Sequence, residues 1–254
     1  MERIDGAPWV GTSWKMTKTL AEGREFARGL AEALAAEPRL RERVRPFVIP
    51  PHTALAAVAA ELEGSGVVVG AQNAHWEDAG AWTGEVSVPQ VADAGAALVE
   101  IGHSERREHF GETVETTAAK VAATLRHGLT PLLCVGEPAE VRDAGGSAEH
   151  ILAQVRGALD GLSEEELGRV LVAYEPIWAI GEHGRPATVP ELEAPFAALQ
   201  GEFGSRTAAI LYGGSVHQDN AAELLAMDDV DGLFVGRAAW RLEGYLELLR
   251  LAAG

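Results

Sequence analysis

The chain carries the run Val170-Leu171-Val172-Ala173-Tyr174-Glu175-Pro176-Ile177-Trp178-Ala179-Ile180-Gly181. Its apolar start, Val170–Ala173, is typical of a strand buried in a parallel sheet. Pro176 has no N–H to donate and ends the pairing, which puts Glu175 at the end of the strand. The apolar residues after it are too few for a helix and lead into glycine. The run predicts either a carboxylate base below a closing lid, Pro176–Gly181, or a strand end with a solvated Glu and an ordinary loop.

Short apolar runs of this kind alternate with helical patterns along the whole chain. The predicted strands are Pro8–Gly11, Pro46–Ile49, Val67–Gly70, Leu98–Ile101, Pro131–Val135, Val170–Ala173, Ala208–Leu211 and Gly232–Val235. The predicted helices include Leu20–Ala36, Ala54–Leu62, Val114–His127, Glu149–Leu159, Glu191–Phe203, Asn220–Ala226 and Trp240–Leu251. Eight strands alternating with helices predict an α/β fold, a (β/α)₈ TIM barrel. A doubly wound open sheet is the alternative, but no G-x-G-x-x-G follows the first strand. Without a linker or composition break, we predict a single domain over residues 1–254.

Composition narrows the functional classes. The 254 residues are 47% hydrophobic, enough for one large core, and carry a formal net charge of -17. Such an acidic chain is a poor partner for nucleic acid or for an anionic membrane. The single cysteine, Cys134, excludes a disulfide framework and a cysteine-ligated zinc site. Residues 1–6 show no signal-like apolar region, and no run approaches the ~18 apolar residues of a membrane span, so a cytoplasmic protein is expected.

Barrel enzymes place their chemistry on the loops that follow the strands, and they often hold phosphate after strands 7 and 8. The segments expected on that face are Thr12-Ser13-Trp14-Lys15-Met16, the stretch from Ala71-Gln72-Asn73 to Glu85, Gly102-His103-Ser104-Glu105-Arg106-Arg107, the Glu175 stretch, Tyr212-Gly213-Gly214-Ser215-Val216 and Gly236-Arg237. A lysine, a histidine, a glutamate and two glycine-bearing loops are therefore predicted to meet at one face of the barrel.

The glycine-bearing loops suit an anion. Backbone N–H groups of Gly213-Gly214-Ser215 and of Gly236 can approach a phosphate, and helix N-termini beyond them add favourable dipole ends. Glycine-rich turns are common, however, so this motif alone more often marks a simple turn. Lys15 would place a compact positive charge beside a reacting oxygen, although a single lysine after a strand is usually a surface residue.

His103 precedes a helix that is expected to begin near Ser104. The positive end of the helix dipole opposes an imidazolium, so the ring should stay neutral and donate a hydrogen bond. A lone His is usually structural, and the chain has 8. A metal site made of His103, Glu105 and His109 is disfavoured, because positions i and i+6 do not share a helix face and no H-E-x-x-H motif is present. We expect no metal and no cofactor.

Together these groups describe proton abstraction next to a carbonyl. The carboxylate would take a proton from carbon, the neutral His and the Lys would stabilise the enediolate oxygens, and the proton would return to the neighbouring carbon. A lid would exclude water and hold back the loss of phosphate from the enediolate.

The sequence also resembles a known family over nearly its whole length, from Trp9 to Trp240. The segments that carry the resemblance are Val99-Glu100-Ile101-Gly102-His103-Ser104-Glu105-Arg106-Arg107, Tyr174 to Gly181, Tyr212-Gly213-Gly214-Ser215-Val216, Ala71-Gln72-Asn73 and Trp82-Thr83-Gly84-Glu85. They are similar to those of the triosephosphate isomerases, whose Glu base and neutral His are well known. The resemblance implies that Glu175 is the base, His103 the electrophile and Lys15 the cation.

The same resemblance implies further roles and partners. Glu105 would support Lys15, and the phosphate of a small phosphorylated sugar would be held by Gly181, Ser215 and Gly236. Thr83 lies on a long loop that, in the family, inserts into a partner subunit. A homodimer or higher oligomer is therefore implied.

Three segments depart from the family pattern. The family has Asn-x-Lys after the first strand, where this chain has Ser13-Trp14-Lys15, and paired glycines after the eighth, where it has Gly236-Arg237. The lid continues with Glu182-His183-Gly184-Arg185-Pro186, which is longer and more polar than usual. These forms are similar to those of the erythrulose-phosphate isomerase branch, whose substrate has one more hydroxymethyl group. Ser13 would leave room for that group and hydrogen-bond to it, whereas Arg237 would pair with phosphate or only brace the last helix.

Two other functions stay open. One is an ordinary triosephosphate isomerase in which Ser13 and Arg237 are neutral changes. The other is a non-catalytic barrel kept for binding. The intact Glu175, His103 and Lys15 disfavour the second, because a binding module has no need of a base.

Overall fold

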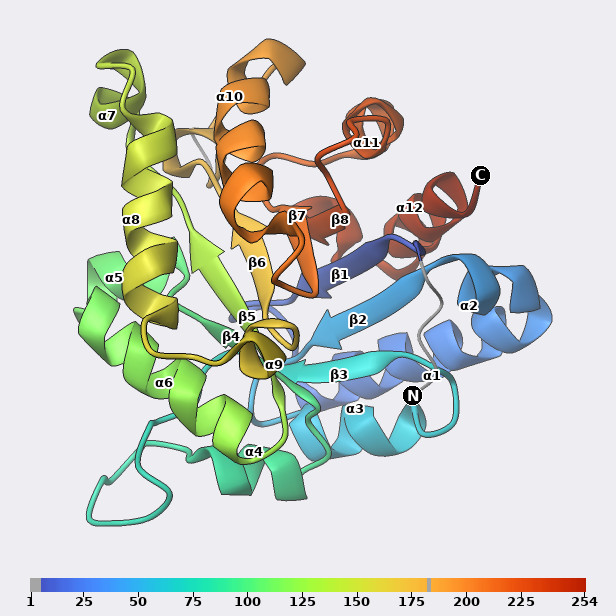
Figure 1. Ribbon diagram of the computed structural model, residues 1–254. Helices are drawn as coiled ribbons and strands as arrows, with labels where there is room; N and C mark the ends of the chain where they lie inside the picture. Colours follow the sequence, from blue (N-terminus) through green and yellow to red (C-terminus); the bar gives the residue numbers. More distant parts are fainter. Residues whose placement is uncertain (1–5, 182–183) are drawn as a thin grey trace.

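The computed structural model describes residues 6–181 and 184–254, and its strands form a closed parallel barrel (Figure 1). The strands follow one another around the barrel in chain order: β1 (Trp9–Ser13), β2 (Arg45–Ile49), β3 (Val68–Ala71), β4 (Leu98–Ile101), β5 (Thr130–Val135), β6 (Leu171–Tyr174), β7 (Ala209–Tyr212) and β8 (Gly232–Val235). Pairing of β1 with β8 closes the barrel. The (β/α)₈ prediction is confirmed, and the open sheet is excluded.

Helices surround the strands, as Figure 1 shows. They are α1 (Leu20–Ala36), α2 (Pro38–Arg43), α3 (Leu55–Glu61), α4 (Val88–Asp93), α5 (Ser104–Phe110), α6 (Val114–Arg126), α7 (Ala139–Asp143), α8 (Ser147–Leu159), α9 (Glu164–Leu167), α10 (Val189–Leu199), α11 (Gln218–Leu225) and α12 (Leu242–Ala253). Short helices such as α2, α4, α7 and α9 were not predicted, because they span too few turns to show a hydrophobic period. None of the helices in the described ranges is long and apolar enough to cross a membrane.

Several element boundaries differ from the predictions by one or two residues. The strands predicted at Val67–Gly70, Val170–Ala173 and Ala208–Leu211 lie one residue early, and β1 runs two residues beyond Gly11. The apolar runs end before the pairing does: Ser13 still pairs with Ile49, and Tyr174 with Tyr212. The helix predicted at Glu191–Phe203 is α10 followed by a π-helical turn, η2 (Gln200–Gly204).

Side chains alternate along each strand between the barrel interior and the helix layer. On β4, Leu98 belongs to the apolar cluster inside the barrel, whereas Val99 and Ile101 pack in the larger cluster between strands and helices. The interior cluster consists of Phe47, Ile49, Leu98, Leu132, Cys134, Leu171, Ala173, Ala209, Leu211 and Phe234. The barrel is therefore filled by side chains, and any site must lie at one of its ends.

Candidate active site

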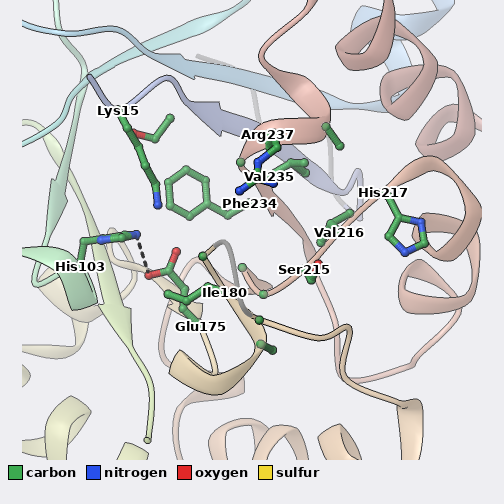
Figure 2. A pocket seen from close by; sticks show the side chains of 18 of the residues that line it. Lys15, His103, Glu175, Ile180, Ser215, Val216, His217, Phe234, Val235 and Arg237 are labelled. Atoms are coloured by element: carbon green, nitrogen blue, oxygen red, sulfur yellow. Dashed lines mark ion pairs between the residues drawn. The ribbon is translucent and has the colours of Figure 1, made fainter. Parts of the chain in front are cut away.

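A cavity of about 400 Å³ lies at the carboxyl ends of the strands, among the loops that follow β1, β4, β6, β7 and β8. Most residues that the sequence singled out line it, and Figure 2 shows Lys15, His103 and Glu175 together at one side. The predicted site residues among its lining are Ser13, Lys15, His103, Glu175, Ala179, Ile180, Gly181, Ser215, Gly236 and Arg237. Glu105 does not line this cavity, but its carboxylate forms an ion pair with Lys15 at 2.6 Å.

Glu175 follows β6 and is fixed at the floor of the cavity. Its backbone N–H donates to the carbonyl of Val135 at 2.7 Å, and the residue is only 4% exposed. Gly213 allows this position, because a Cβ at Gly213 would come within 2.6 Å of the Glu175 Cγ. Burial, followed by the negative charge of Glu100, raises the pKa of Glu175 to about 8. Its Oε2 has no hydrogen-bond partner among the described residues, so it is free to receive a proton.

His103 faces Glu175 across the cavity. It caps the N-terminus of α5: the backbone N–H of Glu105 donates to His103 Nδ1 at 3.1 Å. Because Nδ1 accepts, the proton of the neutral ring sits on Nε2, which lies 3.6 Å from Oε2 of Glu175 (Figure 2). Burial, and then the positive charge of Lys15, lower the pKa of His103 to about 4.

Lys15 is held in a strained backbone conformation with φ 48°, in the left-handed region that non-glycine residues rarely adopt. Its Nζ donates to Glu105 Oε1 at 2.6 Å. Burial alone would lower the pKa of Lys15, but the hydrogen bond and charge of Glu105, with smaller effects of Glu175 and Glu100, raise it. The ammonium group therefore stays charged beside the two cavity residues Glu175 and His103.

Glu100 is a site residue for which sequence reasoning gave no role. It lies on β4, is 4% exposed, and lines the cavity. Ser13 Oγ donates to Glu100 Oε2 at 2.8 Å. Burial raises the pKa of Glu100 to about 7, against the hydrogen bond from Ser13 and the charge of Lys15. The signal that could have found it is a charged residue inside the otherwise apolar run Leu98–Ile101.

The opposite end of the cavity is lined by the glycine-bearing loops after β7 and β8, with the His217 side chain beside them (Figure 2). Gly213, Gly214 and Ser215 follow β7, and Gly236 and Arg237 follow β8. Figure 2 shows Ser215 and Val216 well separated from Lys15. The Arg237 side chain is exposed at the rim and forms no ion pair with any carboxylate in the described ranges.

The predicted lid is anchored by a second buried carboxylate that sequence reasoning missed. The short 3₁₀ turn η1 (Ile177–Ala179) follows Pro176, and Trp178 Nε1 donates to Glu137 Oε1 at 2.9 Å. The same oxygen accepts from the Tyr174 hydroxyl at 3.1 Å and the Ser147 hydroxyl at 3.0 Å. Ile180 and Gly181 reach the cavity, while Glu182 and His183 of the extended lid lie outside the described residues.

Known proteins share this sequence and this fold. The chain is 64% identical over 246 residues to an L-erythrulose-1-phosphate isomerase of Mycolicibacterium smegmatis, covering 96% of this chain and 93% of the relative. Proteins with the same name from Mesorhizobium japonicum and Brucella abortus are 49% and 51% identical over 249 residues, with at least 96% of each chain covered. A crystal structure of triosephosphate isomerase from Bartonella henselae superposes with a TM-score of 0.82 at 32% identity, covering 96% of this chain and 98% of that one.

The family model described as triosephosphate isomerase matches residues 8–252, which include every predicted site residue. The family resemblance seen in the sequence is confirmed, and so is its isomerase class. The chain therefore belongs to the triosephosphate isomerase family of phosphosugar isomerases.

Proposed function

We propose that this protein interconverts L-erythrulose 1-phosphate and D-erythrulose 4-phosphate through an enediolate. The observation that carries the proposal is the opposition of the buried Glu175 carboxylate and the neutral His103 at 3.6 Å, in a family of isomerases. The names of the relatives at 64%, 49% and 51% identity support the choice of substrate.

The chemistry moves one proton between adjacent carbons. Glu175 removes the proton from C3 of L-erythrulose 1-phosphate, and the C–H electron pair flows towards the C2 carbonyl to give the enediolate. His103 donates from Nε2 and Lys15 supplies positive charge, so that the two enediolate oxygens are stabilised. Glu175 then returns the proton to C2, while the proton of the C3 hydroxyl passes to the C2 oxygen by way of His103 Nε2. The carbonyl forms at C3, and the product is D-erythrulose 4-phosphate. The raised pKa of Glu175 suits a group that must both accept and release this proton.

The other end of the cavity suits the phosphate. Backbone N–H groups around Gly214, Ser215 and Gly236 are proposed to bind it, with Gly181 closing from the lid and Arg237 adding positive charge at the rim. Phosphorylated sugars are retained inside cells because moving their charge out of water is costly. We therefore propose a cytoplasmic location.

The test is an isomerisation assay with L-erythrulose 1-phosphate and dihydroxyacetone phosphate under identical conditions. We expect the protein to turn over L-erythrulose 1-phosphate with a higher kcat/KM than dihydroxyacetone phosphate, whether or not it accepts the triose phosphate. A higher kcat/KM for the triose phosphate would assign the protein as a triosephosphate isomerase instead. No turnover of either compound would make it a non-catalytic barrel.

We also propose that the protein is at least a homodimer. The most exposed large apolar side chains in the described ranges are Met16 at 98%, Phe110 at 68% and Trp82 at 51%. Met16 directly follows Lys15, and all residues from Glu77 to Glu85 are exposed in a loop that projects from the barrel in Figure 1. Met16 and Phe110 line one hollow together with Gly84 and Glu85 of this loop, and exposed apolar side chains gathered in one place mark an interaction surface. A partner at this face would cover them and brace Lys15.

Sedimentation at micromolar concentration tests the dimer. We expect a mass of about twice 26.8 kDa, and the double substitution Met16→Asp with Trp82→Asp should move the population towards the monomer. A wild-type mass near 26.8 kDa would refute the proposal.

A further inference from the structure

A carboxylate stands at a position where the rest of the barrel interior is apolar. Leu98, two residues before Glu100 on β4, lies inside the barrel, and Glu100 pairs in register with the apolar Leu132. The residue is 4% exposed. Moving a carboxylate into such surroundings is costly unless its oxygens find partners. A leucine at this position would therefore stabilise the fold at least as well as Glu100 does.

Only part of the Glu100 carboxylate is satisfied. Ser13 Oγ donates to Oε2 at 2.8 Å, and no other hydrogen bond to this carboxylate comes from the described ranges. The residue lines the active-site cavity, so the second oxygen is available to a bound molecule. Because the Ser13 hydroxyl donates its proton to Glu100, its oxygen can meet the substrate only as a hydrogen-bond acceptor.

Ser13 is itself fixed from a second side. Trp240 Nε1 donates to the backbone carbonyl of Ser13 at 2.9 Å, and Trp240 also lines the cavity. The segments after β1 and β8 that depart from the family pattern are thus connected to each other, and through Ser13 to Glu100. A carboxylate held in this way presents its free oxygen in a defined place.

The geometry of the substrate points to what that oxygen binds. With phosphate on C1 at the glycine-bearing end and C2 and C3 beside Glu175, the C4 hydroxymethyl of the tetrulose must extend away from the phosphate. Ser13 and Glu100 lie at that end, because they line a second hollow together with Lys15 and His103 that none of the glycine-bearing loops after β7 and β8 reaches. We propose that Glu100, positioned by Ser13, accepts a hydrogen bond from the C4 hydroxyl and is the residue that selects the four-carbon substrate. This inference rests on the proposed function.

The test compares wild type with Glu100→Leu on the two substrates. Glu100→Leu should fold, because it replaces a buried carboxyl by an apolar side chain of similar size; its melting temperature serves as the check. We expect kcat/KM for L-erythrulose 1-phosphate to fall about tenfold or more relative to that for dihydroxyacetone phosphate, as for a lost hydrogen bond to a charged group. Glu100→Gln, which retains an oxygen acceptor, should lose less of this preference.

Binding without turnover gives a second readout. Erythritol 4-phosphate and glycerol 3-phosphate differ by the added hydroxymethyl and lack the reacting carbonyl. Glu100→Leu should weaken inhibition by erythritol 4-phosphate and leave that by glycerol 3-phosphate nearly unchanged. The control Arg237→Ala removes the positive charge proposed for the phosphate at the other end of the cavity, and should weaken inhibition by both equally.

The outcomes separate this inference from the proposed function. If wild type does not prefer the tetrulose phosphate, the proposed function fails and this inference with it. If wild type has the preference but Glu100→Leu changes kcat/KM for both substrates by the same factor, the proposed function stands and Glu100 acts only through the charge that it places beside Glu175. That result would overturn the inference.

Discussion

At one end of the cavity the working groups are buried side chains with shifted pKa values, Glu100, His103 and Glu175, whereas at the other they are backbone N–H groups of glycine-bearing loops. The first end depends on which protons are bound and on the identity of each side chain. The second depends mainly on the path of the backbone through the glycine-bearing loops. Substitutions at the first end should therefore change rate, substrate preference and pH dependence while phosphate binding survives.

The largest effect confined to one end of the cavity is expected from Glu175→Gln, which should lower kcat and leave phosphate binding intact. The amide keeps size and hydrogen bonding but has no basic lone pair, so kcat should fall by about 10²–10⁴-fold, the contribution of a general base. Inhibition by glycerol 3-phosphate should persist, because the phosphate end is untouched. A variant that keeps more than half of the wild-type kcat would show that Glu175 is not the base.

Stability provides a control for the same variant. The pKa of Glu175 is raised from 4.5 to about 8 in the folded protein, so the folded state binds more protons than the unfolded state between these values. Its contribution to stability is therefore lost as pH rises from about 4.5 to about 8. Glu175→Gln lacks this titration, and its melting temperature at pH 8 should be no lower than that of wild type.

A smaller effect at the same end is expected from Ser13→Asn. The bulkier amide would fill the space proposed for the added hydroxymethyl group, and the donor to Glu100 would shift. The preference for L-erythrulose 1-phosphate over dihydroxyacetone phosphate should fall by about 5- to 150-fold, corresponding to ~1–3 kcal/mol for an unpaired buried polar group. The ratio of the two kcat/KM values measures it, and an unmoved ratio would exclude Ser13 from substrate selection.

Glu175 and Glu100 also show what the sequence could and could not predict. The barrel follows from the alternation of apolar runs and helical patterns, and Glu175 follows from its place before Pro176 at a strand end. Glu100 is different, because alone it is one charge in a short apolar run. Its partner Ser13 is 87 residues away, so only the closed barrel brings them together. The hydrogen bond from Trp178 to Glu137 also could not be predicted from the sequence, because 41 residues separate the two.

The pH dependence of kcat/KM should follow the raised pKa of Glu175 at the side-chain end of the cavity. A base with a pKa of about 8 is about one-tenth ionised at pH 7 and about nine-tenths ionised at pH 9, so kcat/KM should rise about tenfold between them. The substrate phosphate, with a second pKa of about 6, is already a dianion over this range. Glu100→Leu should shift the midpoint downward, because the Glu100 charge raises the pKa of Glu175. A flat profile from pH 7 to 9 would contradict the raised pKa.

At His103 we expect no change of protonation state across the working pH range. Burial and the charge of Lys15 lower the pKa of His103 to about 4, so the ring should remain neutral from pH 9 down to about pH 5. The backbone N–H of Glu105 donates to Nδ1, so the single proton should be found on Nε2 throughout. Nitrogen NMR of the ring distinguishes the two nitrogens and reports both the charge and the tautomer.

The same depressed pKa fixes the sign of a stability effect. The unfolded ring takes up a proton below about pH 6.5 and the folded ring does not, so His103 makes folding less favourable as pH falls from about 6.5 to about 4. His103→Gln removes this destabilising protonation of the unfolded state, so the melting temperature should fall less as pH is lowered. A positively charged His103 at pH 7 in the resting protein would reverse both expectations, because an imidazolium could not be the neutral donor that faces Glu175.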